Sequence, residues 1–179
     1  QRCSDTRAVT FSDVRIPDSN IVGGNDGAGW YNAMAAFDLS RPNIAAHAVG
    51  LAQSAYEHAL QYADERHSFG KKLHQHQALQ FMLADMKTKI EAARLLTWKA
   101  AFLADNGERN TEAAAHAKRF AADTAMEVTT DAVQIFGGYG YSEEYPVARL
   151  MRGAKVIQIY EGSSQVQRMI IGREITRNL

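Results

Sequence analysis

A single acidic residue stands at a break in the chain near its end. The stretch VIQIYEGSSQVQRM runs through apolar residues to Glu161, breaks at Gly162 and continues into a predicted helix. Glycine there lets another molecule come close to the backbone. A carboxylate shielded from water holds a proton firmly, which suits a general base for a weak carbon acid. A solvated loop acid is the other interpretation, and it stays open. A buried approach is predicted from the preceding side chains, Ile157, Ile159 and Tyr160.

Two further stretches have residue types that could bind an anion. In ERHSFGKK, Arg66 presents a forked, permanently charged donor suited to a phosphate, and Ser68 adds a hydroxyl. The same residues also fit an ordinary helix end, with Gly70 as the stop. In QIFGGYGYS, residues 134–142, the glycines either let a phosphate or ribose approach the backbone or simply end a helix.

Composition and motif spacing exclude several kinds of site. His74 and His76 form an H-x-H pair, but no carboxylate or cysteine stands at a recognisable ligand spacing, so no metal site is predicted. Cys3 is the only cysteine, which excludes a disulfide framework. Twenty basic side chains balance twenty acidic ones, which argues against nucleic acid as the main partner. No apolar run approaches the roughly 20 residues of a membrane span.

Helical periodicity dominates the chain from about residue 27. An apolar face begins at Trp30, and Ser40 is the predicted N-cap of a helix that carries Pro42 in its first turn. Apolar residues three and four apart then predict a helix ended by Asn106-Gly107 and another ended by Gly137-Gly138. The predicted helices cover residues 40–62, 79–103, 111–135, 145–154 and 165–176.

Long helices joined by short loops predict an all-α, antiparallel helical bundle over residues 27–179. Residues 1–26 differ, because AVTFSDVRIP alternates apolar and polar residues and predicts a strand closed by Pro17. Such a strand cannot satisfy its edges alone. We therefore expect residues 1–26 to be a short β remnant of a neighbouring domain, and the chain to be part of a longer protein.

Four stretches in one order resemble the acyl-CoA dehydrogenases, flavoproteins of fatty-acid and amino-acid breakdown. They are FDLSRP, ERHSFGKKLHQHQALQFMLADM, TTDAVQIFGGYGYSEEYPVARLMR and IYEGSSQVQR, and the resemblance covers essentially the whole chain. It is strongest to family members that act on medium-chain substrates. It implies an enzyme with an N-terminal helical, a middle β and a C-terminal helical domain. Residues 1–26 would be the tail of the middle β domain, and residues 27–179 the C-terminal bundle.

The resemblance also implies a reaction and its residues. FAD-dependent α,β-dehydrogenation would convert a straight-chain, medium-chain acyl-CoA to a trans-2-enoyl-CoA, with Glu161 as the base that removes the α-proton and Arg41 supporting it. Some relatives carry the base just before this arginine. Ser40 stands there and cannot serve, which favours Glu161 and straight-chain over isovaleryl-type substrates. The residues implied to bind the substrate are Phe37, Asp38, Tyr160 and Gly162.

The implied cofactor is FAD, shared between protomers of a homotetramer, with electron-transfer flavoprotein as the electron acceptor. The implied location is the mitochondrial matrix or the bacterial cytoplasm. Two departures from the family pattern are Ser163, which keeps the hydroxyl of the usual threonine, and Gly153, where an aspartate is usual. The residues implied to contact FAD are Arg66, Ser68, Phe69, Gln77, Gln134, Gly138, Ser163 and Gln165.

Two alternatives to this reading stay open. Most of the flavin platform would lie on the other domains, so the chain by itself could be a non-catalytic helical oligomerisation module. The parent protein could also be an acyl-CoA oxidase, which differs from a dehydrogenase in oxygen access.

Overall fold

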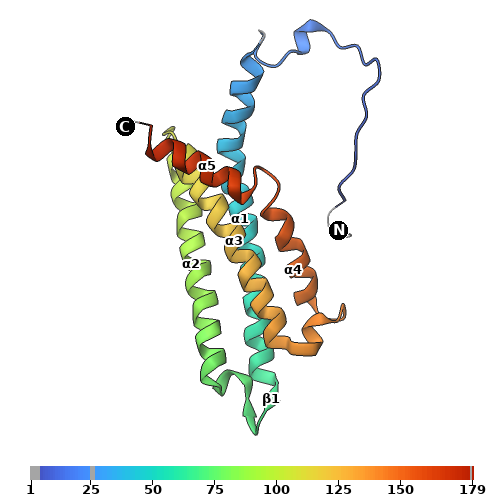
Figure 1. Cartoon of the computed structure of the whole chain (residues 1–179), viewed down its shortest axis with the longest axis vertical. Coiled ribbons are helices and arrows are strands. Elements are labelled where there is room, and N and C mark those ends of the chain that lie inside the picture. Colours follow the sequence, from blue (N-terminus) through green and yellow to red (C-terminus); the bar gives the residue numbers. More distant parts are fainter. Residues whose placement is uncertain (1–4, 25–26, 178) are drawn as a thin grey trace.

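The computed structural model describes residues 5–24, 27–177 and 179. The helices are α1 (Ala28–Glu65), α2 (Gln77–Asp105), α3 (Thr111–Phe136), α4 (Pro146–Ile157) and α5 (Ser164–Ile175). Helices α1 to α4 run alternately up and down, and α5 lies across one end of the bundle (Figure 1). This arrangement confirms the all-α antiparallel bundle.

Helix α3 lies at the centre and packs against α1, α2, α4 and α5. Its inward face is rich in alanine, which lets neighbouring helices approach closely, and the α1 residues facing it are small as well. Larger side chains such as Met86, Ile90 and Val128 fill the remaining core. The fully buried alanines of these two helices include Ala48, Ala52, Ala55, Ala114, Ala117 and Ala125.

Glycines end two of the predicted helices where expected. Gly107 follows α2 with a φ of +69°, and Gly137 follows α3 with a φ of +61°. Side chains rarely adopt this left-handed conformation, so glycine is the residue that ends a helix most readily. After α3 a 3-10 turn over Gly137–Tyr141 leads to α4, which begins at Pro146 as predicted.

The start of α1 differs from the prediction, because Ser40 is not an N-cap and Pro42 lies inside the helix. A proline inside a helix cannot donate to the carbonyl four residues earlier, here that of Asp38. The side-chain amide of Asn110 donates to this carbonyl at 2.9 Å instead. The loop before α3 thus supplies the hydrogen bond that the proline cannot form, and α1 begins upstream at Ala28.

A short hairpin with two residues in each strand joins α1 to α2. Strand β1 (His67–Ser68) pairs antiparallel with β2 (Lys71–Lys72), and a 3-10 turn over Leu73–Gln75 leads into α2. Figure 1 shows this hairpin at the end of the bundle opposite α5.

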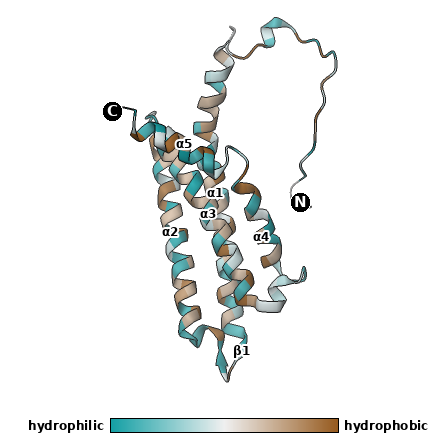
Figure 2. Cartoon of the chain, viewed as in Figure 1, coloured by the Kyte–Doolittle hydropathy of each residue, from teal (hydrophilic) through white to brown (hydrophobic). Residues whose placement is uncertain are grey.

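The strand predicted over residues 8–17 is wrong for this chain. Residues 5–24 contain a 3-10 turn at Asp18–Asn20 and no strand, and all of them are exposed. A strand needs a neighbour for its N–H and C=O groups, and the segment arches away from the start of α1 and lies apart from the helices (Figure 1). Figure 2 shows apolar residues along this segment and along the projecting start of α1, where Trp30 is 67% exposed.

Among the described residues, no helix combines the length and apolar character needed to cross a membrane.

Candidate active site

Glu161 lies in the short loop that turns the chain from α4 into α5. Helix α4 ends at Ile157, and the N–H of Ser164 donates to the carbonyl of Gln158 at 3.0 Å to close the loop. The hydroxyl of Ser163 accepts from the Val166 N–H and caps α5. Gly162 has a φ of +85°, and Glu161 itself has a φ of +58°, which is uncommon for a residue with a side chain.

The predicted buried approach to Glu161 is wrong in part. Ile157 is fully buried, but Ile159 is 59% exposed. The reason is that the segment is the last turn of α4 and a tight loop rather than an extended run, so alternate residues do not share one face. Tyr160 is half-buried, and its hydroxyl lies 3.4 Å from Nδ1 of His47 on α1. Burial, and to a lesser extent the Glu161 carboxylate, raise the pKa of Tyr160.

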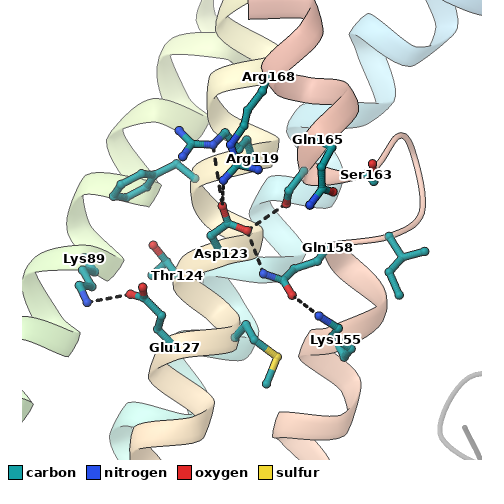
Figure 3. Close-up of a pocket in the computed structure, with 14 residues that line it drawn as sticks. Lys89, Arg119, Asp123, Thr124, Glu127, Lys155, Gln158, Ser163, Gln165 and Arg168 are labelled. Atoms are coloured by element: carbon teal, nitrogen blue, oxygen red, sulfur yellow. Dashed lines mark hydrogen bonds and ion pairs between the residues drawn. The ribbon is translucent and has the colours of Figure 1, made fainter.

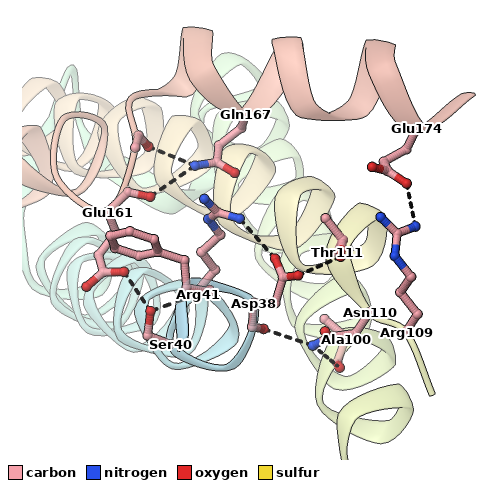
Figure 4. Close-up of polar contacts among 12 residues, drawn as sticks. Asp38, Ser40, Arg41, Ala100, Arg109, Asn110, Thr111, Glu161, Gln167 and Glu174 are labelled. Atoms are coloured by element: carbon pink, nitrogen blue, oxygen red, sulfur yellow. Dashed lines mark hydrogen bonds and ion pairs between the residues drawn. The ribbon is translucent and has the colours of Figure 1, made fainter. Parts of the chain in front are cut away.

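The carboxylate of Glu161 points at the first half of α1. The hydroxyl of Ser40 donates to Oε2 of Glu161 at 2.6 Å, so residues 121 positions apart meet (Figure 4). Both side chains are half-buried. A carboxylate held by one hydroxyl keeps other lone pairs free to accept a proton.

Arg41 supplies a buried positive charge beside this carboxylate. Its side chain is 7% exposed, and Nη1 lies 3.1 Å from Oδ1 of Asp38. Thr111 of α3 donates to the other Asp38 oxygen at 2.5 Å, which fixes the aspartate (Figure 4). Burial lowers the pKa of Arg41, and the negative charges of Asp38 and Glu161 oppose that shift. Among the described residues, none forms a hydrogen bond with the buried Nε of Arg41.

The two other predicted substrate residues on α1 lie against this arginine. The guanidinium carbon of Arg41 lies 5.4 Å from the centre of the Phe37 ring, which is half-buried. Asp38 is occupied by Arg41 and Thr111. The predicted substrate and catalytic residues of α1 and of the Glu161 loop therefore come together at one place.

Two residues that the sequence interpretation missed hold the backbone of the loop. Lys118 donates to the carbonyl of Gly162 at 2.7 Å, and Gln167 donates to the carbonyls of Glu161 and Gly162 at 3.1 and 2.9 Å. Both side chains are fully buried. A signal for Lys118 exists, because it is a lone lysine within the alanine stripe of α3. Nothing in the local sequence marks Gln167.

A cavity of about 650 Å³ lies beside the loop, lined by α2, α3, α4 and α5 (Figure 3). Ser163 and Gln165, two predicted cofactor contacts, are on its wall. Asp123 is its central acceptor, taking hydrogen bonds from Gln158 at 2.8 Å and Ser164 at 2.9 Å. The cavity also presents four basic side chains against two acidic ones, which suits an anionic ligand; the basic ones are Lys89, Arg119, Lys155 and Arg168.

A second cavity, of about 540 Å³, lies at the hairpin end of the bundle. Arg66, Ser68 and Gly138, three predicted cofactor contacts, are on its wall together with Tyr139. The guanidinium of Arg66 lies 5.7 Å from the centre of the Tyr139 ring. A fork-shaped cation, a hydroxyl and a side-chain-free backbone fit a diphosphate, so the residues present suit the cofactor that the sequence implies.

The remaining predicted cofactor residues lie around the hairpin end but outside this cavity. Phe69 is at the tip of the hairpin and 96% exposed, with a φ of +49°. Gln77 begins α2, and Gln134 lies near the end of α3; both are exposed.

One chain does not bring its two groups of predicted cofactor residues together. Asp123 lines the first cavity and Phe136 the second. These two residues are thirteen positions apart on α3, which at the rise of an α-helix is about 20 Å. Figure 1 shows the hairpin and α5 at opposite ends of the bundle.

The two histidines of the H-x-H pair contact different partners. His74 lies 3.2 Å from Asp64, and His76 meets the carbonyl of Ser68 at 3.1 Å. The described part of the chain contains no cluster of three or more His, Cys, Asp or Glu able to hold a metal ion.

Comparison with known proteins gives consistent matches to one family. The model of the acyl-CoA dehydrogenase C-terminal domain matches residues 27–176. The chain is 49% identical to cyclohexane-1-carbonyl-CoA dehydrogenase of Geobacter metallireducens over 99% of this chain and 46% of the relative. It is 51% identical to the short-chain specific acyl-CoA dehydrogenase of Megasphaera elsdenii over 97% of this chain and 45% of the relative.

The fold also matches solved structures. Butyryl-CoA dehydrogenase from Megasphaera elsdenii superimposes with a TM-score of 0.84 and 53% identity, over 85% of this chain and 40% of that chain. The chain spans less than half the length of these curated relatives.

Proposed function

Since this chain belongs to the acyl-CoA dehydrogenase family, we propose that it forms the C-terminal part of a flavoenzyme. That enzyme oxidises a straight-chain acyl-CoA to the trans-2-enoyl-CoA. Residues 1–26 are proposed as the tail of its middle β domain and residues 27–179 as its C-terminal domain.

The observation that carries the proposal is the meeting of Glu161, Ser40 and Arg41. The half-buried Glu161 carboxylate has one hydroxyl donor, at 2.6 Å, and a buried guanidinium nearby. Such a carboxylate suits the removal of a proton from carbon, because its charge is positioned before substrate arrives.

In the proposed reaction Glu161 takes the proton from the carbon α to the thioester carbonyl. FAD, when bound, supplies the acceptor for the hydrogen that leaves the β-carbon with its electron pair, and the double bond forms between the two carbons. Ser40 orients the carboxylate before the proton moves. Arg41 stabilises negative charge in this region, and Tyr160 and Gly162 flank the reacting carbons.

The FAD would be held by residues from both ends of the bundle. Arg66, Ser68 and Gly138 suit the diphosphate and adenosine portion, with Phe69, Gln77 and Gln134 around them, while Ser163 and Gln165 contact the cofactor from the catalytic loop. The proposal that two copies share the cofactor follows from the family resemblance. The exposed apolar side chains of α2 further support assembly into a homotetramer; they are Leu95, Trp98 and Phe102.

Substrate length and electron acceptor are part of the proposal. A medium-chain substrate follows from the resemblance of the motifs, whereas the matched relatives carry short-chain and alicyclic names. Electron-transfer flavoprotein is the proposed acceptor, and the mitochondrial matrix or the bacterial cytoplasm the proposed location.

The test uses the intact flavoprotein that carries this chain. Acyl-CoA-dependent reduction of a dye is measured with butyryl-, octanoyl- and palmitoyl-CoA, with electron-transfer flavoprotein and with oxygen as alternative acceptors. Octanoyl-CoA is expected to react fastest. Turnover with oxygen alone would indicate an oxidase, and no turnover with any of the three would refute the proposal.

The non-catalytic module is the second candidate for the chain by itself, supported by its length of less than half that of its relatives. Purified residues 1–179 are expected to show no flavin absorbance and no dye reduction. Activity of this chain alone would refute the module.

A further inference from the structure

We propose that Lys118 of α3 and Gln167 of α5 are positioning residues that set the direction of the Glu161 carboxylate. They do so by holding the two backbone carbonyls of residues 161 and 162. The inference rests on the proposed role of Glu161 as the base, and names the parts of the fold that keep this base in place.

Three hydrogen bonds converge on these two carbonyls. The carbonyl of Gly162 accepts from the Lys118 ammonium at 2.7 Å and from the Gln167 amide at 2.9 Å, which uses both of its lone pairs. The same Gln167 nitrogen donates its other proton to the carbonyl of Glu161 at 3.1 Å (Figure 4). Two elements far apart in the sequence therefore hold two successive peptide units.

These bonds hold a backbone conformation that the chain does not favour by itself. Both Glu161 and Gly162 have positive φ, at +58° and +85°. A residue with a side chain pays conformational free energy in this region, and such a conformation persists only when its surroundings impose it. The direction of the Glu161 side chain follows from that backbone, and it leads to the Ser40 hydroxyl. Releasing the carbonyls would free the base to point elsewhere.

Packing alone does not explain a lysine at position 118. Its side chain is fully buried among the alanines of α3, where an apolar residue of similar length would fill the same space without burying a charge. The charged groups around its ammonium are Asp123 on α3, Arg41 on α1 and Glu161 in the loop. Burial lowers the pKa of Lys118 to about 8, so it remains a charged donor at neutral pH. The hydrogen bond from the ammonium to the Gly162 carbonyl offsets part of the free-energy cost of burying this charge.

The first test measures the loop directly in the intact flavoprotein that carries this chain. Hydrogen–deuterium exchange over residues 158–164 is compared between the natural chain and Lys118→Met, which keeps the length of the side chain and removes its donors. Loss of a hydrogen bond to a charged group should speed exchange in the loop roughly ten- to a hundredfold while α2 exchange stays unchanged. Lys99→Met, on the exposed face of α2, is the matched control. Loop exchange equal to that of the natural chain would overturn the proposal.

The second test measures the chemical step in the intact flavoprotein. Lys118→Met should lower kcat roughly tenfold or more with KM changed less than twofold. With substrate deuterated at the α-carbon, the isotope effect on kcat should rise, because proton removal becomes slower than the other steps. Lower activity without a higher isotope effect would reflect a uniform loss of folded or flavin-loaded enzyme, and that result would overturn the positioning role. An unchanged kcat in a variant with faster loop exchange would overturn the positioning role.

Gln167→Leu gives an independent second variant. It removes the other half of the clamp, and its effects should match those of Lys118→Met in kind and be less than additive in the double variant, because both side chains hold one carbonyl. Fully additive effects would overturn the shared clamp. The exchange test does not depend on turnover, so a natural enzyme without acyl-CoA activity would refute the proposed function and leave the loop result standing.

Discussion

The hydroxyl of Ser40 donates to the carboxylate of Glu161 at 2.6 Å, although 121 positions separate the two residues. Ser40 is in the first half of α1, and Glu161 is in the loop between α4 and α5. The side chains at positions 40 and 161 therefore point into the same small region of the site.

A carboxylate placed at position 40 should restore part of the activity that is lost when Glu161 is replaced. Glu161→Gln should lower kcat of the intact enzyme by at least roughly a hundredfold, because the amide cannot accept the α-proton. Adding Ser40→Glu to this variant places a carboxylate within reach of the same region and should recover a measurable fraction of turnover. Flavin content and acyl-CoA binding, measured by absorbance titration, should stay close to natural values. A double variant as inactive as Glu161→Gln would show that the two positions do not share one region of the site.

The loop should not tolerate a side chain at position 162. A Cβ on Gly162 would stand 2.8 Å from Nε2 of Gln167, and the φ of +85° strains any other residue. Gly162→Ala should lower the free energy of unfolding by about 1–3 kcal/mol, measured by urea denaturation. Gly172→Ala is the matched control, since a Cβ there would meet no described atom within 4 Å beyond its chain neighbours and the backbone of its own helix. It should leave stability unchanged or raise it, because alanine favours a helix interior. Equal stability of both variants would contradict the strain.

Lys118 should give the protein a distinctive pH dependence of stability. Its folded pKa is lowered from 10.5 to about 8 by burial. Below about pH 8 both folded and unfolded chains hold the proton, and the cost of burying the charge is fully present. Between about pH 8 and 10.5 the unfolded chain binds more protons, so this residue makes the free energy of unfolding rise with pH.

Comparison with Lys118→Met isolates this contribution. The stability of the natural chain relative to the variant should increase by up to roughly 3 kcal/mol as the pH rises through that window. Urea denaturation at a series of pH values measures the difference, and Lys99→Met should follow the natural chain throughout. Parallel curves for the natural chain and Lys118→Met would mean that Lys118 does not titrate there.

Removing the partner of Arg41 should cost more than removing an exposed ion pair. Asp38→Asn removes the carboxylate that pairs with the buried guanidinium at 3.1 Å, and we expect a loss of about 2 kcal/mol in the free energy of unfolding. Asp64→Asn, which breaks an exposed pair with Lys72 at 2.8 Å, should cost far less, because solvent screens that pair. Thermal denaturation of the two variants side by side decides the point, and an equal loss would argue against a buried charge at Arg41.

The fork of Arg66 should matter for flavin retention by the intact enzyme. Arg66→Ala should lower the flavin bound per subunit after gel filtration, and Arg66→Lys should restore it only in part, because an ammonium cannot bind a phosphate with two parallel bonds. Arg149→Ala, an exposed arginine on α4, is the control. Full flavin content in Arg66→Ala would exclude the phosphate role.

Local patterns were sufficient to predict most helices and their ends. The alanine stripe of α3, the glycines at 107 and 137, and the proline at 146 act within a few residues of chain, so their effect can be predicted without the fold. The start of α1 could not be predicted in this way. Pro42 indicates a first turn by local rules, and only the Asn110 amide, brought from the loop before α3, lets the helix run through it.

The same distinction between local and long-range information applies to the candidate site. The sequence by itself determined which residue types were present, including the lone acid at a glycine break, and its motifs indicated the family. Tertiary structure decided that the Glu161 carboxylate meets Ser40 and that Lys118 and Gln167 hold the loop from α3 and α5. It also decided that residues 8–17 form no strand here. Hydrogen bonds between distant segments and the pairing of a strand depend on which groups packing brings within about 3 Å, and no local pattern contains that information.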